Sequence, residues 1–247
     1  GAFLVERYAR GCRAFERPQN VLKYTALAAV AAPALSASIG VFSLCLGGLA
    51  TWTSFGGVWL TWWLGDAGGA LIVAPTILLW LERRSVRWGP GRAAEGVLLA
   101  VAIGMAGWAI FAGEGTWSYW EFLCLPLLVW TAFRWGPRDA ATALFILTGV
   151  SVLSLWMERG ALDAVTMNAL LLQFQGFLII VAITMLTLAA AVEDQKRTDR
   201  ELAKSTQEHR LILDGALDAV VTMDMEGKIT GWNPQAERIF GWTSAEA

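Results

Sequence analysis

The stretch from Trp59 to Pro75 constrains this fold most, because it has the hydropathy of a membrane helix and yet holds an aspartate. It reads WLTWWLGDAGGALIVAP, with Trp62 and Trp63 shortly before Asp66. A carboxylate in the middle of a bilayer costs roughly 2.5–3.5 kcal/mol on insertion scales, so such residues face the inside of a helix bundle. The stretch therefore predicts a membrane protein of several helices, with this helix inside the bundle.

The composition agrees with an integral membrane protein. Of the 247 residues, 56% are hydrophobic and only 16% are charged, whereas soluble domains carry about a quarter charged residues. The net charge of −2 gives no indication of a nucleic-acid partner. Three cysteines in separate segments and a single histidine predict no metal site. The sequence also lacks a nucleophile–base pair and a phosphate-binding loop, so we expect no catalytic residue in it.

Hydropathy predicts six complete membrane-spanning helices, because about 20 residues cross a core of about 30 Å. They cover residues 22–50, 57–82, 94–112, 119–134, 139–156 and 164–192. The fourth and fifth are short, and we expect one of them to be tilted or partly re-entrant. The chain begins abruptly, as if within a helix, which suggests that N-terminal helices are missing. The expected fold is an all-α polytopic membrane helix bundle.

The basic residues alternate between loops and so predict the orientation. The loops before the first span and after the second, fourth and sixth contain five, four, two and many Lys or Arg residues, and the other loops contain none, none and one. Because basic loops stay in the cytoplasm, the C-terminal region is expected there. The tryptophans of the opening stretch then lie toward the outer side.

After residue 192 the chain becomes highly charged without a glycine or proline, and we expect one helix to continue out of the membrane over residues 193–211. Its heptad positions include Val192, Leu202 and Leu213, although Asp199 falls on the same seam. A parallel homodimer through this signalling helix and a simple solvated helix are both compatible with the pattern.

Beyond Gly215 the pattern predicts a strand, a tight turn, a second strand and a short helix that Asn233 caps. The sequences ILDGALDAVV at residues 212–221 and WNPQAERIFGW at residues 232–242 resemble the beginning of a PAS domain. This segment covers only the first hairpin and one or two helices of that α+β fold. A PAS pocket needs more of the domain, so the cofactor is unknown.

The segment from residue 1 to 192 resembles the membrane-associated sensor family of type one, MASE1. The resemblance rests on FERP at residues 15–18, SASIG at residues 36–40 and above all on the stretch from Trp59 to Pro75. It implies a sensory input region in the bacterial inner membrane, joined to PAS and to an effector domain further along the same chain. A sensor histidine kinase of a two-component system is favoured, with a cyclic-di-GMP turnover enzyme next. A transporter or channel, or a membrane anchor within a larger assembly, are the alternatives.

The candidate sensing site surrounds Asp66, which either responds to a ligand or a proton or is held by amides of the sixth span. The ligand-sensing candidates share polar or aromatic side chains within the membrane: Asp66, Trp59, Trp62, Trp63, Asn168, Gln173 and Gln175. The three tryptophans would otherwise form an aromatic belt at the interface. Small or helix-breaking residues next to Asp66 predict helix packing and a hinge: Gly65, Gly68, Gly69 and Pro75.

Overall fold

The computed structural model describes residues 11–81, 89–111, 124–157, 164–243 and 246–247. It divides into two compact units, which we call the membrane unit (Gly1–Asp194) and the C-terminal unit (Gln195–Ala247). The predicted first residues of the fourth span, 119–123, lie outside the described residues.

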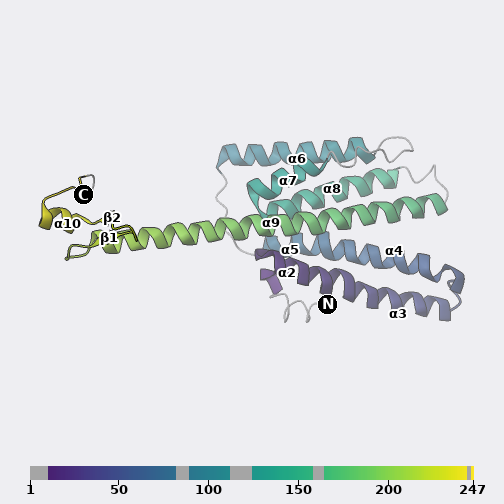
Figure 1. Cartoon of the computed structure of the whole chain (residues 1–247). Helices are drawn as coiled ribbons and strands as arrows, with labels where there is room; N and C mark the ends of the chain where they lie inside the picture. Colours follow the sequence, from purple (N-terminus) through teal and green to yellow (C-terminus); the bar gives the residue numbers. More distant parts are fainter. Residues whose placement is uncertain (1–10, 82–88, 112–123, 158–163, 244–245) are drawn as a thin grey trace. The chain divides into compact units, whose positions relative to one another are not determined.

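The first half of the membrane unit consists of two long helical rods, each interrupted by a π-helical turn (Figure 1). The first rod contains η1 (Gly11–Glu16), α2 (Pro18–Tyr24), η2 (Thr25–Ala31) and α3 (Ala32–Leu46). The second contains η3 (Trp52–Ser54), α4 (Phe55–Gly68), η4 (Gly69–Val73) and α5 (Ala74–Leu81). The π turns η2 and η4 lie just before Pro33 and Pro75. Proline lacks an N–H and its ring clashes with the carbonyl four residues back, so the α-helical ladder is broken there.

Among the described residues, the second half of the membrane unit contains α6 (Pro90–Phe111), α7 (Cys124–Trp135), α8 (Pro137–Met157) and the first part of α9 (Ala164–Asp214). The chain turns from α7 into α8 at Gly136, whose φ of 96° favours glycine. Figure 1 shows the first part of α9 running between α6–α8 and α2–α5. Its buried side chains recur every three or four residues, as Phe174, Leu178, Ala182 and Met185 show, so one stripe of the helix enters the core.

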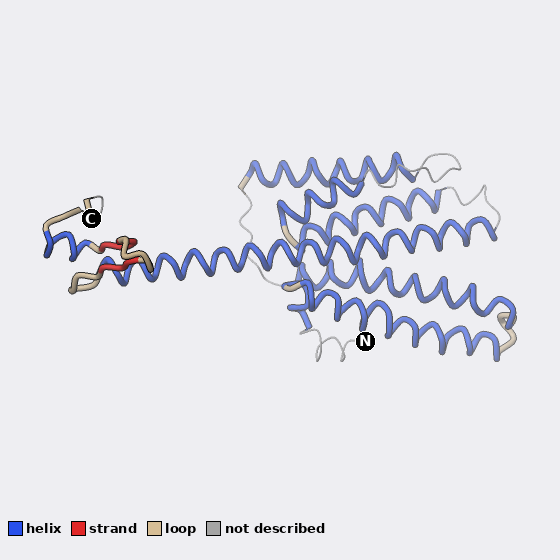
Figure 2. Tube along the Cα trace, viewed as in Figure 1, coloured by secondary structure: helices blue, strands red, loops and turns tan. Residues whose placement is uncertain are grey.

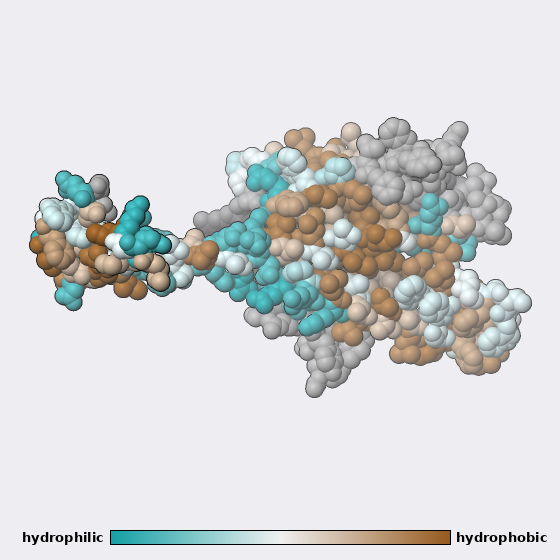
Figure 3. Space-filling model, viewed as in Figure 1, coloured by the Kyte–Doolittle hydropathy of each residue, from teal (hydrophilic) through white to brown (hydrophobic). Residues whose placement is uncertain are grey.

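Large apolar side chains also cover the outside of the membrane unit, as expected of a protein surrounded by lipid. Figures 2 and 3 show this unit as a set of helices whose visible surface is largely apolar. Among the described residues, three helices are long and apolar enough to cross a membrane, and a shorter apolar one accompanies them: Pro18–Leu46, Trp52–Leu81, Leu171–Asp214 and Ala93–Trp108. The predicted all-α membrane bundle is thus confirmed.

The C-terminal unit contains the last turns of α9, an antiparallel hairpin of β1 (Val221–Met223) and β2 (Ile229–Trp232), and α10 (Pro234–Phe240). The hairpin turn uses Gly227 at φ 84°, and the Asp224 carboxylate accepts hydrogen bonds from the N–H groups of Glu226 and Lys228 at 3.1 and 2.8 Å. The predicted α+β segment is therefore present.

Candidate functional site

Two of the three tryptophans donate hydrogen bonds from α4 to the first rod. The Trp59 and Trp63 rings stack with centroids 5.6 Å apart, because residues four apart share a helix face. The Trp59 indole N–H donates to Ser38 Oγ at 3.0 Å, and that of Trp63 donates to the Val30 carbonyl at 3.1 Å. Both acceptors belong to the first rod, in α3 and in the π turn before it.

The third tryptophan, Trp62, packs its ring against α3 of the first rod. The Trp62 ring lies directly against Gly40 of α3, where even a Cβ atom would collide with it. A residue larger than glycine would have to push the ring away. The structure therefore brings all three tryptophans together at the contact between α4 and the first rod.

Asp66 lies near the middle of the apolar helix Trp52–Leu81 and is exposed on the surface of the membrane unit. Within the described residues its carboxylate has no hydrogen bond and no ion pair. None of the amides predicted to hold it bonds this carboxylate in the described part of the chain. Asn168 Oδ1 accepts a hydrogen bond from Thr61 Oγ1 at 3.1 Å, and Gln173 is exposed. The predicted sensing residues therefore do not form one cluster. The tryptophans contact the first rod, and Asn168 bonds Thr61.

Gln175 of α9 lies beside the turn of α4 that contains Gly65. A Cβ at Gly65 would lie 3.6 Å from Gln175 Nε2, an ordinary van der Waals distance, so this glycine is not needed for the helices to approach. The Gln175 Oε1 atom is buried and has no hydrogen-bond partner among the described residues. At Gly68 and Gly69 a Cβ would meet no atom within 4 Å, so in the described part of the chain these two glycines are not points of tight helix contact.

Sequence reasoning missed Tyr24, which completes the hydrogen bonding of the π turn before Pro75. Its hydroxyl donates to the Ala70 carbonyl at 2.6 Å. In an α-helix that carbonyl would accept from Ala74, but the Ala74 N–H donates to Gly69 instead. The next candidate is residue 75, and proline has no N–H. The phenol therefore supplies the donor that the main chain lacks, and Pro75 was the sequence signal that one was needed.

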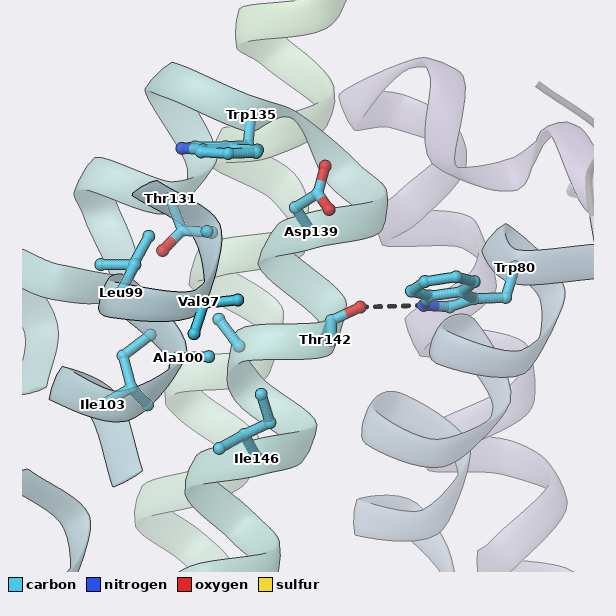
Figure 4. A pocket seen from close by; sticks show the side chains of 12 residues that line it. Trp80, Val97, Leu99, Ala100, Ile103, Thr131, Trp135, Asp139, Thr142 and Ile146 are labelled. Carbon is cyan, nitrogen blue, oxygen red and sulfur yellow. Dashed lines mark hydrogen bonds between the residues drawn. The ribbon is translucent and has the colours of Figure 1, made fainter. Parts of the chain in front are cut away.

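A second polar contact joins α5 to α8 near the end of the second rod. The Trp80 indole N–H donates to Thr142 Oγ1 at 2.9 Å, the dashed line in Figure 4. The guanidinium carbon of Arg138 lies 3.8 Å from the centroid of the Trp80 ring, which is a cation–π geometry. Trp80 also forms part of the wall of a cavity that the sequence did not predict.

In the C-terminal unit, Asn233 connects four segments through one buried side chain. Its Oδ1 accepts from the N–H groups of Ala236 and Val220, both at 2.9 Å. Its Nδ2 donates to the carbonyls of Leu213 at 3.0 Å and Asp218 at 3.1 Å. The predicted cap of α10 is thus correct, and the same amide also holds the last turn of α9 against the start of the hairpin.

Comparison with known families agrees with this arrangement. The MASE1 family matches residues 1–196, and the PAS fold matches residues 207–247. Searches of curated proteins and of solved structures each found no match. An apolar helix bundle whose last helix leads into a PAS segment defines the membrane sensory input region of a signalling protein. The chain belongs to the MASE1 family.

Proposed function

We propose that this region lies in the bacterial inner membrane with its C-terminal part in the cytoplasm. A stimulus at the membrane unit passes through α9 to the PAS segment and to an effector further along the full-length chain. A sensor histidine kinase is the favoured effector, and a cyclic-di-GMP turnover enzyme is the second choice. The observation that carries this proposal is α9 itself, which is one helix from Ala164 to Asp214.

Contacts at the end of the membrane unit support a relay role for α9. Arg17 Nε lies 3.6 Å from Asp194 Oδ1, so the beginning of α2 is tied to α9 at this point. A Cβ at Gly136 would lie 3.7 Å from Glu193 Oε2, so the α7–α8 junction touches the same turn. Movement of either element would act directly on the helix that continues toward PAS.

The input side of the proposal rests on Asp66. An acidic residue within a membrane helix is costly and is commonly part of a ligand, ion or proton site. Because its carboxylate has no bonding partner among the described residues, a ligand or a proton at Asp66 would displace no existing contact. The hydrogen bonds of Trp59 and Trp63 hold the same helix against the first rod.

The decisive experiment replaces Asp66 by Asn in the full-length protein. We expect signal output, measured as phosphorylation or as cyclic-di-GMP level, to lose its response to the stimulus while the amount of protein in the membrane stays unchanged. Ser43→Ala on α3 is the matched control, because the exposed Ser43 hydroxyl donates to the Ile39 carbonyl of its own helix and to no other described residue. A normal response in Asp66→Asn would remove Asp66 from the mechanism.

A homodimer through α9 is also part of the proposal. The C-terminal part of α9 is exposed and charged, but Leu202 and Leu213, which share one helix face, leave 67% and 42% of their surface uncovered. Apolar side chains on a charged helix are the residues that a parallel coiled-coil partner would cover.

A further inference from the structure

The cavity beside Trp80 is lined mostly by apolar surface and has polar side chains at one end. It has a volume of about 210 Å³ and lies between α5, α6, α7 and α8. Figure 4 shows Trp135 and Asp139 at one end, and Ile103 and Ile146 at the other. Asp139 and Ile146 are seven residues apart on α8, which corresponds to about 10 Å along the helix. A molecule that fills the cavity would therefore need one polar and one apolar end.

The cavity is reached from the outer surface of the bundle. Two of the residues in its wall, Val97 and Trp80, are 63% and 51% exposed. Next to Val97 on α6, Leu98 and Val101 are exposed apolar side chains, which in a membrane face lipid. The nearest source of an occupant is therefore the bilayer itself.

The volume favours part of a lipid over a whole soluble ligand. At about 30 Å³ for each water-sized group, 210 Å³ holds about seven such groups. Pockets for drug-sized molecules measure about 300–1,000 Å³. A segment of one acyl chain fits this space, with the rest of the lipid outside.

Two charged residues near the cavity, Arg138 and Asp139, indicate which head group fits. Arg138 stacks on Trp80, and its buried Nε has no hydrogen-bond partner in the described part of the chain. Arg134, near the end of α7, differs because its Nε already lies 3.2 Å from Glu95 Oε1. Asp139, the residue after Arg138 in α8, lines the cavity. An arginine suits a phosphate and a carboxylate suits an ammonium group.

We propose that this cavity binds a phospholipid whose head group carries a primary ammonium, such as phosphatidylethanolamine. An acyl chain enters between α5 and α6 toward Ile103, the phosphate meets Arg138, and the ammonium group lies toward Asp139. Basic pockets between membrane helices recognise lipid head groups in this way. The site does not depend on the proposed relay through α9.

Lipid binding is tested on the whole chain purified in detergent, with native mass spectrometry after addition of matched phosphatidylethanolamine, phosphatidylcholine and phosphatidylglycerol. We expect one retained phosphatidylethanolamine per chain, preferred about tenfold, as one additional charge-assisted hydrogen bond would give. Phosphatidylcholine is the informative competitor, because its methylated ammonium has no N–H to donate. Equal retention of the three lipids, or retention of none, overturns the proposal.

Variants separate the cavity from the head-group contacts. Ala100→Phe fills the cavity and should abolish retention, while Val101→Phe, on the adjacent lipid-facing position, should not. Asp139→Asn should reduce the preference for phosphatidylethanolamine, and Arg138→Gln should weaken all three phospholipids. Circular dichroism and thermal unfolding confirm that each variant is folded. Unchanged retention in folded Ala100→Phe or folded Arg138→Gln would contradict the site, and if Ala100→Phe does not fold, Arg138→Gln decides.

Discussion

The hydrogen bond from Tyr24 to Ala70 should stabilise the membrane unit only because Pro75 follows the π turn. Tyr24→Phe removes the hydroxyl and keeps the ring, whose edge contact with Phe15 has a centroid distance of 5.0 Å. It leaves the Ala70 carbonyl without a donor, which costs about 1–3 kcal/mol for a buried group. In a domain of this size about 1 kcal/mol lowers Tm by roughly 2–4 °C, so the expected decrease is roughly 2–12 °C.

A double-mutant cycle with Pro75→Ala tests the reason as well as the size of this effect. Alanine restores an N–H at position 75, so the main chain can again satisfy the Ala70 carbonyl. Tyr24→Phe should then cost less than half as much as it does beside the native proline. Thermal unfolding of the whole chain in lipid nanodiscs, followed by helical circular dichroism, measures all four proteins. An equal loss of Tm in both backgrounds would refute the reasoning, because the two positions would then be independent.

Three further changes test other contacts. Asn233→Asp keeps the acceptor bonds that cap α10 but cannot donate to the last turn of α9, so hydrogen exchange should become faster there while α10 stays protected; unchanged exchange would show that the donated bonds contribute nothing. Gly40→Ala forces a tryptophan ring away and should destabilise the chain by about 1–3 kcal/mol, whereas Gly149→Ala, in open space, should not; similar Tm values would contradict the contact. In a chain without native cysteines, Leu202→Cys should form a disulfide between copies and Lys204→Cys, on the opposite face, should not; equal cross-linking argues against a specific dimer.

The sequence predicted the helices because each depends on local information. Hydropathy gave the spans, the charged segment after residue 192 indicated a continuing helix, and Asn233 with Pro234 marked the start of α10. The notable departure is the pair of π turns, which hydropathy does not report. Each comes before a proline, at Pro33 and Pro75, so the signal was present; Pro75 was interpreted only as a hinge, and Pro33 was not interpreted.

The site was harder to predict because periodicity shows which residues share a face and not which neighbour that face meets. Trp59, Trp63 and Asp66 do share a face, and we expected a pocket or an interfacial belt there. Instead the indoles bond Ser38 and Val30 of the preceding rod. The cavity that combines aromatic side chains with a carboxylate is instead lined by Trp80 and Asp139. These two residues are far apart in the sequence.

The two rods are joined by hydrogen bonds at the π turns that precede their prolines. Trp63 of the second rod donates to Val30 in the π turn of the first, and Tyr24 of the first donates to Ala70 in the π turn of the second. Asp66 lies on the short helical segment between Trp63 and the second π turn. In the proposed relay, both ends of that segment are bonded to the first rod, so a change at Asp66 would move that rod. The contact of Arg17 with Asp194 would then carry the movement to α9.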